Sequence, residues 1–377
     1  MKILLVTQRF RPLIGGAESV LSELARELAR QNHTVTVLTA RWEQSWAEQE
    51  RVDDVEIVRI PLSQMRFWGT WRFMAALRRW LLDRGREFDI WYVSMLKHCA
   101  WVAVAASSHC NVPVVLRPEG SGPTGDIAWQ QHALGGMRIR RRCERAAALV
   151  ALSPHIRSEL ERAGMPSSRI HEIPNGVPIP PLGDEIDRMA CRQRLGLKTS
   201  APMAVFVGRI SPEKGVEDLL AAWNRVETEL PAAQLVIVGC GPQETELRAR
   251  SAKHPNIIWV GASQEQDRYL RAADLFVLPS HEEGMSISLL EAMAASLPIV
   301  ATDIPGNRSL IESGRHGLLV PPKRPDQLAK SMLLQLQAKS IAAAMGRAAR
   351  DRVEEEFSIT RMAKRHVELF QSLVKTV

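Results

Sequence analysis

Two glutamates, Glu283 and Glu291, stand eight positions apart in the stretch HEEGMSISLLEAM, which spans residues 281–293. A short apolar run precedes this stretch, and apolar residues recur at helical spacing from Met285 onward. The pattern therefore predicts a strand, a turn and a helix, with Glu283 in the turn and Glu291 about two turns into the helix. Carboxylates at these places can accept hydrogen bonds from pairs of hydroxyl groups, which sugars offer.

The start of the same predicted helix is a candidate anion site. The first N–H groups of a helix lack partners inside it and carry a partial positive charge, so they bind phosphate groups well. The N–H groups expected to face such a ligand belong to Gly284, Met285, Ser286 and Ile287. A plainer interpretation stays open, in which Glu283 complements the helix dipole and Glu291 is an ordinary solvated side chain.

Two cations follow another predicted strand. Arg209 and Lys214 lie just after the apolar run MAVFV, where a loop is predicted. Arginine can bind a phosphate bidentately and lysine acts as a point charge, so the two side chains together can hold a diphosphate. Both residues are also ordinary on a solvated surface, and only their position after a strand favours the functional interpretation.

Glycine pairs follow two further strands. Gly15 and Gly16 come after the first strand and before a helix predicted near Ala17, where adjacent glycines let a ligand approach the backbone. An ordinary tight turn explains them equally well. Gly239 and Gly241 resemble half of a dinucleotide fingerprint, but Glu244 stands where its third glycine should be.

The elements that must position these residues alternate along the whole chain. Short apolar runs rich in β-branched residues are separated by amphipathic helical patterns, which predicts the α/β class with parallel sheets covered on both faces. The runs begin at residues 2, 33, 55, 89, 112 and 148 and again at 203, 233, 257, 274, 297 and 317. Because ligands bind beyond the carboxyl ends of such strands, the loops named above are the places where a site is expected.

The chain divides near its middle. Its 377 residues exceed one ordinary core, and four prolines and two glycines interrupt regular structure across 173–185. We place the boundary near Asn175, which gives domains over 1–174 and 175–357. A final helical segment, 358–377, carries an apolar stripe that can pack on either domain, including back on the first.

Composition narrows the classes of protein. Residues 1–180 hold 24 Lys and Arg against 18 Asp and Glu, so most of the net charge of +7 lies in the first half. The five cysteines are scattered and suggest neither a disulfide framework nor a zinc site, which fits a reducing, cytoplasmic compartment. No apolar run reaches the roughly 18 to 20 residues that span a bilayer.

The segment 65–86 bears on partners. It holds six arginines and one aspartate among five large aromatic residues, and Arg72, Arg79 and Arg86 recur every seven positions. This pattern is typical of a helix lying on an anionic bilayer, as on the inner face of a membrane, but also of a core helix whose arginines reach water. A second basic cluster, RIRRRCER at 138–145, belongs to the same half.

Taken together, these motifs resemble the family 4 retaining glycosyltransferases of the GT-B fold. The resemblance lies in the order and spacing of Gly15-Gly16, PNGV at 174–177, VGRISPEKG at 207–215, VGCGP at 238–242 and EGMSISLLEAMAASLPIVATDIPG at 283–306. It implies two Rossmann-like βαβ domains with parallel sheets facing a central cleft. The first domain would serve the acceptor and the second the nucleotide-sugar donor.

The resemblance also implies roles for the residues. Glu291 would hold the donor ribose, Glu283 would sit near the transferred sugar, and Arg209, Lys214 and the helix start would hold the diphosphate. Gly15, Gly16 and Gly239 would add backbone contacts to the donor. No metal or other cofactor is expected. If segment 65–86 lies on a membrane, the cleft would face lipid-linked sugars, so the expected acceptor is a sugar or lipid-linked sugar of a surface polysaccharide or glycolipid.

One departure from the family pattern concerns the acceptor side. Many members carry a histidine after the fifth strand of the first domain, whereas this chain has RPEG at 117–120. Glu119 can take a comparable role, and so can Asp126. His98 and His109 come too early in the chain to align.

Two other classes of function remain open from the sequence. A nicotinamide-dependent oxidoreductase can use two Rossmann-like domains, but it needs a complete G-x-G-x-x-G after a first strand, which neither domain supplies. A basic binding module without catalytic activity explains the charge of the first half but leaves the two spaced glutamates unexplained. A nucleic-acid partner is not expected.

Overall fold

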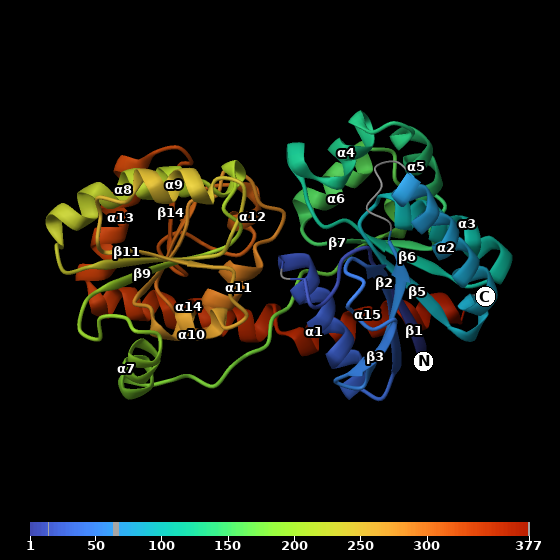
Figure 1. Ribbon diagram of the computed structural model, residues 1–377, viewed down its shortest axis with the longest axis horizontal. Coiled ribbons are helices and arrows are strands. Elements are labelled where there is room, and N and C mark those ends of the chain that lie inside the picture. The colour runs from blue at the N-terminus through green and yellow to red at the C-terminus, as the bar shows by residue number, and fades with distance from the viewer. Residues whose placement is uncertain (14, 63–67, 376–377) are drawn as a thin grey trace. The chain divides into compact units, whose positions relative to one another are not determined.

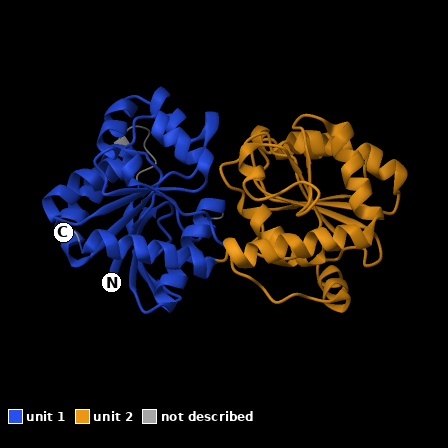
Figure 2. Cartoon of the chain, turned by 180° about the vertical axis from the view of Figure 1, so that it is seen from behind, with its two compact units in different colours: residues 1–176, 359–377 blue, residues 177–358 orange. Residues whose placement is uncertain are grey.

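The computed structural model describes residues 1–13, 15–62 and 68–375. It forms two compact units, shown in different colours in Figure 2. Unit 1 comprises Met1–Gly176 and Ile359–Val377, and unit 2 comprises Val177–Ser358. The chain therefore passes between the units twice, first two residues beyond Asn175, and its final helix belongs to unit 1.

Unit 1 contains an eight-stranded sheet in the order β3-β4-β2-β1-β5-β6-β7-β8 (Figure 1). Neighbouring strands are parallel except for β3, which runs antiparallel to β4. The strands are β1 (Lys2–Val6), β2 (Thr34–Arg41), β3 (Gln49–Val52), β4 (Val55–Pro61), β5 (Ile90–Ser94), β6 (Val114–Arg117), β7 (Ala148–Ala151) and β8 (Ile170–Glu172). Every residue of β5, β6 and β7 is buried, as expected for strands covered on both faces.

The helices of unit 1 form two groups. Helix α1 packs beside α15, and α3 contacts both α2 and α5. The helices are α1 (Gly16–Arg30), α2 (Trp68–Arg84), α3 (His98–Cys110), α4 (Asp126–His132), α5 (Gly136–Cys143), α6 (Pro154–Arg162) and α15 (Ile359–Val374). Short 3-10 turns lie at Gly85–Glu87, Gly122–Thr124 and Ser167–Arg169. Among the described residues, no helix is both long enough and apolar enough to cross a membrane.

Unit 2 contains a fully parallel six-stranded sheet in the order β11-β10-β9-β12-β13-β14. Its strands are β9 (Met203–Val207), β10 (Gln234–Val238), β11 (Ile257–Gly261), β12 (Leu275–Leu278), β13 (Ile299–Thr302) and β14 (Leu318–Val320). Its helices are α7 (Glu185–Arg194), α8 (Val216–Glu229), α9 (Glu244–Arg250), α10 (Gln266–Ala272), α11 (Ile287–Ala294), α12 (Pro305–Arg308), α13 (Pro325–Gln337) and α14 (Lys339–Glu356), with a 3-10 turn at Pro212–Lys214. In Figure 1, α8, α9 and α13 cover one face of this sheet and α10, α11 and α14 the other.

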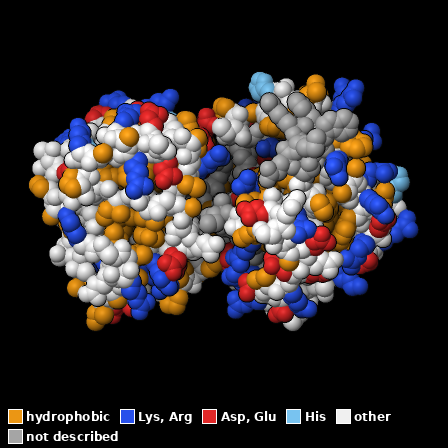
Figure 3. Space-filling view, in the orientation of Figure 1, with side chains coloured by type: hydrophobic (Ala, Val, Ile, Leu, Met, Phe, Trp, Pro, Cys, Tyr) orange, Lys and Arg blue, Asp and Glu red, His pale blue; other side chains and the backbone are white. Residues whose placement is uncertain are grey.

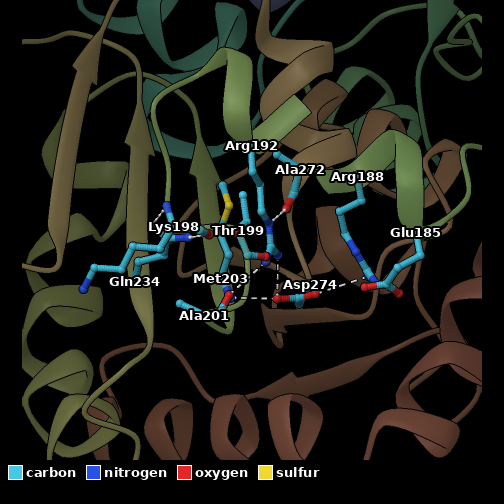
Figure 4. Close-up of polar contacts among 10 residues, drawn as sticks. All are labelled: Glu185, Arg188, Arg192, Lys198, Thr199, Ala201, Met203, Gln234, Ala272 and Asp274. Carbon is cyan, nitrogen blue, oxygen red and sulfur yellow. Dashed lines mark hydrogen bonds and ion pairs between the residues drawn. The ribbon is translucent and has the colours of Figure 1, made fainter. Parts of the chain in front are cut away.

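A buried arginine fastens α7 to the amino ends of the strands of unit 2. Arg192 donates to the carbonyl oxygens of Thr199, Ala201 and Ala272, and its Nη2 lies 2.7 Å from Oδ2 of Asp274 (Figure 4). The same carboxylate accepts the N–H of Met203, the first residue of β9. This cluster stabilises the end of the sheet where the strands begin, opposite to the end from which the candidate site loops leave.

Candidate functional site

The order of strands in unit 2 defines where a ligand is expected. β9 and β12 are neighbours, while the chain leaves β9 for β10 on the other side, so the direction of strand order reverses between them. Open parallel sheets bind ligands beyond the carboxyl ends of the strands at such a point. The loops that follow there span 208–215 and 279–286, and they hold Arg209, Lys214, Glu283 and the residues 284–286 that the sequence singles out.

An ion pair joins these two loops. Nζ of Lys214 lies 2.6 Å from Oε1 of Glu283, and the Glu283 side chain is only 7% exposed. The hydroxyl of Ser280 donates to the same carboxylate oxygen at 2.8 Å. Two residues that are 69 positions apart in the sequence thus meet at the point where the strand order reverses.

A second set of contacts holds the loop before Glu283 against α8. The backbone N–H of His281 donates to the carbonyl of Glu213 at 2.8 Å, and its Nε2 lies 2.7 Å from Oδ2 of Asp218. Gly215 has φ +64°, and a Cβ there would lie 2.1 Å from the carbonyl oxygen of Pro279. The glycine therefore allows the close approach that brings the ion pair together.

The far side of the same loop is fixed by the segment after β13. The hydroxyl of Thr302 donates to the carbonyl of Ser280, and the side-chain amide of Asn307 donates to the carbonyl of Thr302. A Cβ at Gly306 would lie 2.4 Å from the carbonyl oxygen of Glu283, so only glycine fits there without movement. The loop that carries Glu283 is thus fixed on one side by residues 213–218 and on the other side by the segment after β13.

Helix α11 begins slightly later than the sequence predicts. Its first residue is Ile287, and Ser286 is the N-cap, whose hydroxyl accepts the N–H of Leu289 at 3.3 Å. Gly284 and Met285 consequently lie in the turn before the helix, not at its first positions. Glu291 is the fifth residue of α11 and is half-buried, which places it about one turn into the helix instead of two.

Arg209 lies beside the glycines that follow β10. Its side chain is exposed, and its guanidinium makes no hydrogen bond or ion pair with the residues that the structure describes. Gly239 has φ +138°, and a Cβ there would lie 1.8 Å from the carbonyl oxygen of Gly208. Likewise, a Cβ at Gly241 would lie 2.2 Å from the carbonyl oxygen of Ile210. These glycines are required so that two loops can pack together.

The glycine pair of unit 1 also has a local explanation. Gly15 is the N-cap of α1, and a Cβ there would lie 2.2 Å from Oε2 of Glu18. Glu18 is buried, and its other oxygen lies 2.7 Å from Nε of Arg9. A larger residue at position 15 would therefore require the Glu18 carboxylate to move. The role of Gly15 and Gly16 in donor binding stays a prediction.

Glu119 of unit 1 lies two residues beyond the end of β6 in a buried polar setting. Its Oε1 accepts the hydroxyl of Ser94 at 2.6 Å and lies 3.2 Å from Nη1 of Arg117, and its side chain is 10% exposed. Burial raises the pKa of Glu119 to about 7, although Arg117 and the Ser94 hydroxyl favour the ionised form. A carboxyl group that titrates near neutral pH is suited to proton transfer or to orienting a hydroxyl.

The other acceptor-side candidates make structural contacts within unit 1. Asp126 is 3% exposed, and its Oδ2 accepts the backbone N–H of Glu119 at 2.7 Å, so it shapes the loop that carries Glu119. His98 begins α3 and packs edge-on against Trp129 at 5.2 Å. His109 is exposed near the end of α3, where its Nδ1 lies 3.1 Å from a backbone oxygen of the same helix.

Helix α2 uses its apolar stripe within unit 1. Phe73, Leu77 and Leu81 are buried, whereas Arg72 and Arg79 are exposed. The structure thus favours a core helix with arginines that reach water over a helix that lays its apolar face on a bilayer. Residues 65–67 of the basic segment lie outside the described residues.

The second basic cluster lies on the same side as α2, because α3 contacts both α2 and α5. Arg141, Arg145 and Arg169 line an open hollow of about 670 Å³ together with Glu144 and Pro166. Figure 3 shows Lys and Arg side chains over the part of unit 1 that contains α2 and α5. This surface is positively charged in the structure.

The described residues contain no group of three or more His, Cys, Asp or Glu side chains that could hold a metal ion. That finding concerns protein ligands alone. A metal bound chiefly by a substrate would not need such a group. Independence from metals and other cofactors therefore stays a prediction.

Comparison with known proteins agrees with this fold. Residues 14–179 match the family described as Glycosyltransferase Family 4, and residues 201–338 match Glycosyl transferases group 1. A GDP-mannose-dependent monoacylated alpha-(1-6)-phosphatidylinositol monomannoside mannosyltransferase of Corynebacterium glutamicum is 28% identical, over 98% of each chain.

Two solved structures have similar folds. HepE from Anabaena, crystallised with UDP-glucose, has a TM-score of 0.81 and 21% identity, covering 99% of this chain and 100% of its own. Sucrose-phosphate synthase from Thermosynechococcus elongatus has a TM-score of 0.83 and 21% identity, covering all of both chains. At such identities the likeness concerns the fold.

These observations define a glycosyltransferase of the GT-B fold, with two α/β units built on parallel sheets. The chain belongs to glycosyltransferase family 4. The resemblance seen in the sequence is thus confirmed, and so are the fold class and the assignment as a glycosyltransferase. The oxidoreductase and the binding module without catalytic activity are set aside.

Proposed function

We propose that this chain is a retaining glycosyltransferase that moves a sugar from a nucleoside-diphosphate sugar to an acceptor hydroxyl. The single observation that carries the proposal is the ion pair between Lys214 and Glu283, which lies beyond the carboxyl ends of β9 and β12. A cation and a carboxylate side by side suit a ligand that carries a diphosphate next to a sugar. Family membership supports the same reaction class.

The donor is proposed to lie across these loops. Arg209 and Lys214 would hold the diphosphate, assisted by backbone N–H groups around Gly284 and the start of α11. The Ser280 hydroxyl and the Lys214 ammonium both contact Oε1 of Glu283. This carboxylate would accept hydrogen bonds from hydroxyl groups of the transferred sugar. Glu291, one turn into α11, would hold the ribose.

The proposed transfer step uses these groups as follows. The bond between the anomeric carbon and the phosphate oxygen breaks, and the acceptor oxygen bonds to that carbon on the same face. The acceptor proton passes to the departing phosphate, so no external base is needed. Lys214, Arg209 and the start of α11 stabilise the negative charge that grows on the diphosphate, and such groups typically contribute a factor of about 100 to 1000 each.

Glu119 is proposed to orient the acceptor. Ser94 and Arg117 contact its Oε1 atom, and its Oε2 atom makes no hydrogen bond with the described residues. An ionised Glu119 would accept a hydrogen bond from the acceptor hydroxyl through Oε2 and hold that hydroxyl for attack. This carboxylate would then stand in for the histidine that many family members carry.

The acceptor is proposed to be a lipid-linked sugar of a glycolipid or surface polysaccharide, reached from the cytoplasmic side of the membrane. The mannosyltransferase relative is named for a phosphatidylinositol monomannoside, which supports a lipid acceptor. The exposed arginines of α2 and α5 would attract anionic headgroups, with each charge contributing about 1 kcal/mol near the surface. Because α2 buries its apolar stripe, the attraction would be electrostatic.

Product analysis tests the reaction class. The protein would be incubated with GDP-mannose, UDP-glucose or ADP-glucose and a set of lipid-linked and soluble acceptors, without added metal and with a chelator. One donor is expected to yield a product whose anomeric configuration, read by proton NMR, equals that of the donor. An inverted product, or transfer only when Mg²⁺ or Mn²⁺ is added, would contradict the proposal.

A further inference from the structure

A single buried guanidinium contacts both the candidate acceptor residue and the segment that leads out of unit 1. Nη2 of Arg117 donates to Oδ1 of Asn175 at 2.6 Å, and Nη1 lies 3.2 Å from Oε1 of Glu119. The Arg117 side chain is 1% exposed. Asn175 lies in the PNGV stretch, two residues before unit 2 begins.

The burial of Arg117 makes these two contacts consequential. A charged group without water costs several kcal/mol unless hydrogen bonds and opposite charge offset the lost hydration. Among the described residues, Nε and Nη1 of Arg117 make no hydrogen bond of good geometry, so the bond to Asn175 is a principal one. A change at position 175 should therefore be felt at the guanidinium, and through it at Glu119.

The final helix, α15, is connected to the same guanidinium through Tyr92. Nδ1 of His366 lies 2.8 Å from the carbonyl of Met362, which can only accept, so this nitrogen carries the proton. The other ring nitrogen, Nε2, then accepts the hydroxyl of Tyr92 at 3.1 Å. Burial lowers the pKa of His366 to about 3, and Arg117 acts in the same direction, so the imidazole stays neutral. The Tyr92 oxygen also stabilises the charge of Arg117.

From this geometry we infer that Arg117 is a positioning residue: Asn175 sets the place of its guanidinium, and the guanidinium sets the orientation and ionisation of Glu119. The inference rests on the proposed acceptor role of Glu119. It assigns to the PNGV stretch a function in the acceptor site in addition to connecting the two units.

The charged groups around Glu119 define how the coupling should act. Arg117 of β6 favours its ionised form, whereas Asp126 of α4 and Glu18 of α1 disfavour it. Burial is the largest influence and brings the pKa of Glu119 to about 7, where a small change in the pull of Arg117 alters the ionised fraction. The two changes at Asn175 should then have opposite effects.

Asn175→Asp keeps an acceptor for Arg117 and adds a negative charge that competes with Glu119 for the guanidinium. Asn175→Ala removes the competing acceptor and leaves the guanidinium to Glu119. The pKa of Glu119 is expected to rise by at least about 0.5 in the first variant and to fall in the second. Gln131→Glu adds a charge on the exposed surface of α4 and serves as the control. This variant should leave the pKa of Glu119 unchanged.

The pKa is measured directly by ¹³C NMR titration of the full-length protein labelled at the glutamate carboxyl carbons, with the Glu119 signal assigned by its loss in Glu119→Gln. Opposite displacements in the two Asn175 variants support the coupling. Equal changes of the Glu119 pKa in the two variants, or no change in either, would overturn the coupling. If Asn175→Asp does not fold, Asn175→Ala alone decides, and a Glu119 pKa that does not fall in this variant would overturn the coupling. Transfer by Glu119→Gln at the wild-type rate would instead refute the acceptor role and leave the titration result standing.

Discussion

Lys214 and Glu283 form an ion pair of 2.6 Å between loops that follow two adjacent parallel strands. The Glu283 side chain is nearly buried, while Lys214 remains about a quarter exposed. Lys214 therefore has a side open to a ligand, whereas Glu283 is oriented in part by its contacts with Lys214 and Ser280. The ion pair therefore joins the two loops and also orients groups that are proposed to bind the donor.

Removing one partner of this pair should destabilise the protein more than removing both charges. Lys214→Ala leaves a largely buried carboxylate without its cation, which should lower the free energy of unfolding by about 1 to 3 kcal/mol. Combining it with Glu283→Gln removes the orphaned charge and should restore part of the loss. Urea denaturation of the four proteins measures this, and strictly additive effects would mean that the two side chains do not interact.

The two glutamates around α11 should differ in their kinetic roles. Glu291→Ala is expected to raise the KM for the donor with less effect on kcat, because a ribose contact is made equally in ground and transition states. Glu283→Gln is expected chiefly to lower kcat, because this carboxylate is assigned to the reacting sugar. Steady-state rates with varied donor concentration separate the two effects. Small and equal changes in both variants would show that the assignment is wrong.

The pH dependence of transfer should report Glu119. Its pKa is raised from 4.5 to about 7, so the ionised form that accepts the acceptor hydroxyl is populated only as pH rises through 7. Below that pH kcat/KM should fall about tenfold per pH unit. This limb should be absent in Glu119→Gln, which should be slow at every pH. A limb that persists unchanged in that variant belongs to another group.

The raised pKa of Glu119 also predicts how the stability of the fold changes with pH. Between pH 4.5 and 7 the folded protein holds a proton on Glu119 that the unfolded chain has released, so this group makes stability fall as pH rises across that range. The fall should stop above pH 7. Glu119→Gln should show a flatter profile over the same interval, which thermal unfolding at several pH values would detect.

Binding to anionic vesicles tests the proposed membrane contact. Changing Arg72, Arg79 and Arg86 together to Glu should abolish sedimentation with phosphatidylserine vesicles at low salt, because three attractive charges become repulsive. The stability should change only modestly, because the buried stripe of α2 is untouched and the lost contacts, Arg79 with Asp83 and Arg86 with the carbonyl of His109, are exposed. Arg225→Glu on α8 is a control of one exposed charge in unit 2. A wild-type protein that never sediments would favour a soluble acceptor.

The sequence was sufficient for the order of elements because buried strands are uniformly apolar. All twelve apolar runs became strands of two sheets. It missed β3, because the residues QERV of this strand are mostly polar. β3 pairs with β4 in an antiparallel hairpin, and Asp53 and Asp54 in the connecting turn have positive φ. The sequence also missed β8, a three-residue strand at the edge of the sheet.

Contacts between distant residues were beyond the reach of sequence spacing. The residues in the loops after β9 and β12 were predicted as a group, but not that Lys214 meets Glu283 or that His281 meets Asp218. The helix start was placed too early because the apolar spacing continues before the Ser286 cap. Likewise, nothing local to Asn175 indicates its bond to Arg117, which is 58 positions away.

The most direct test of the central claim is calorimetric titration of the protein with UDP, GDP and ADP. One of these nucleotides is expected to bind without metal, and Arg209→Ala and Lys214→Ala should each weaken its binding at least about tenfold and lower kcat/KM about 100-fold. Arg225→Ala, on the exposed face of α8, should bind like the wild type. Binding of none of the three nucleotides, or wild-type affinity in both loop variants, would contradict the account of the donor site.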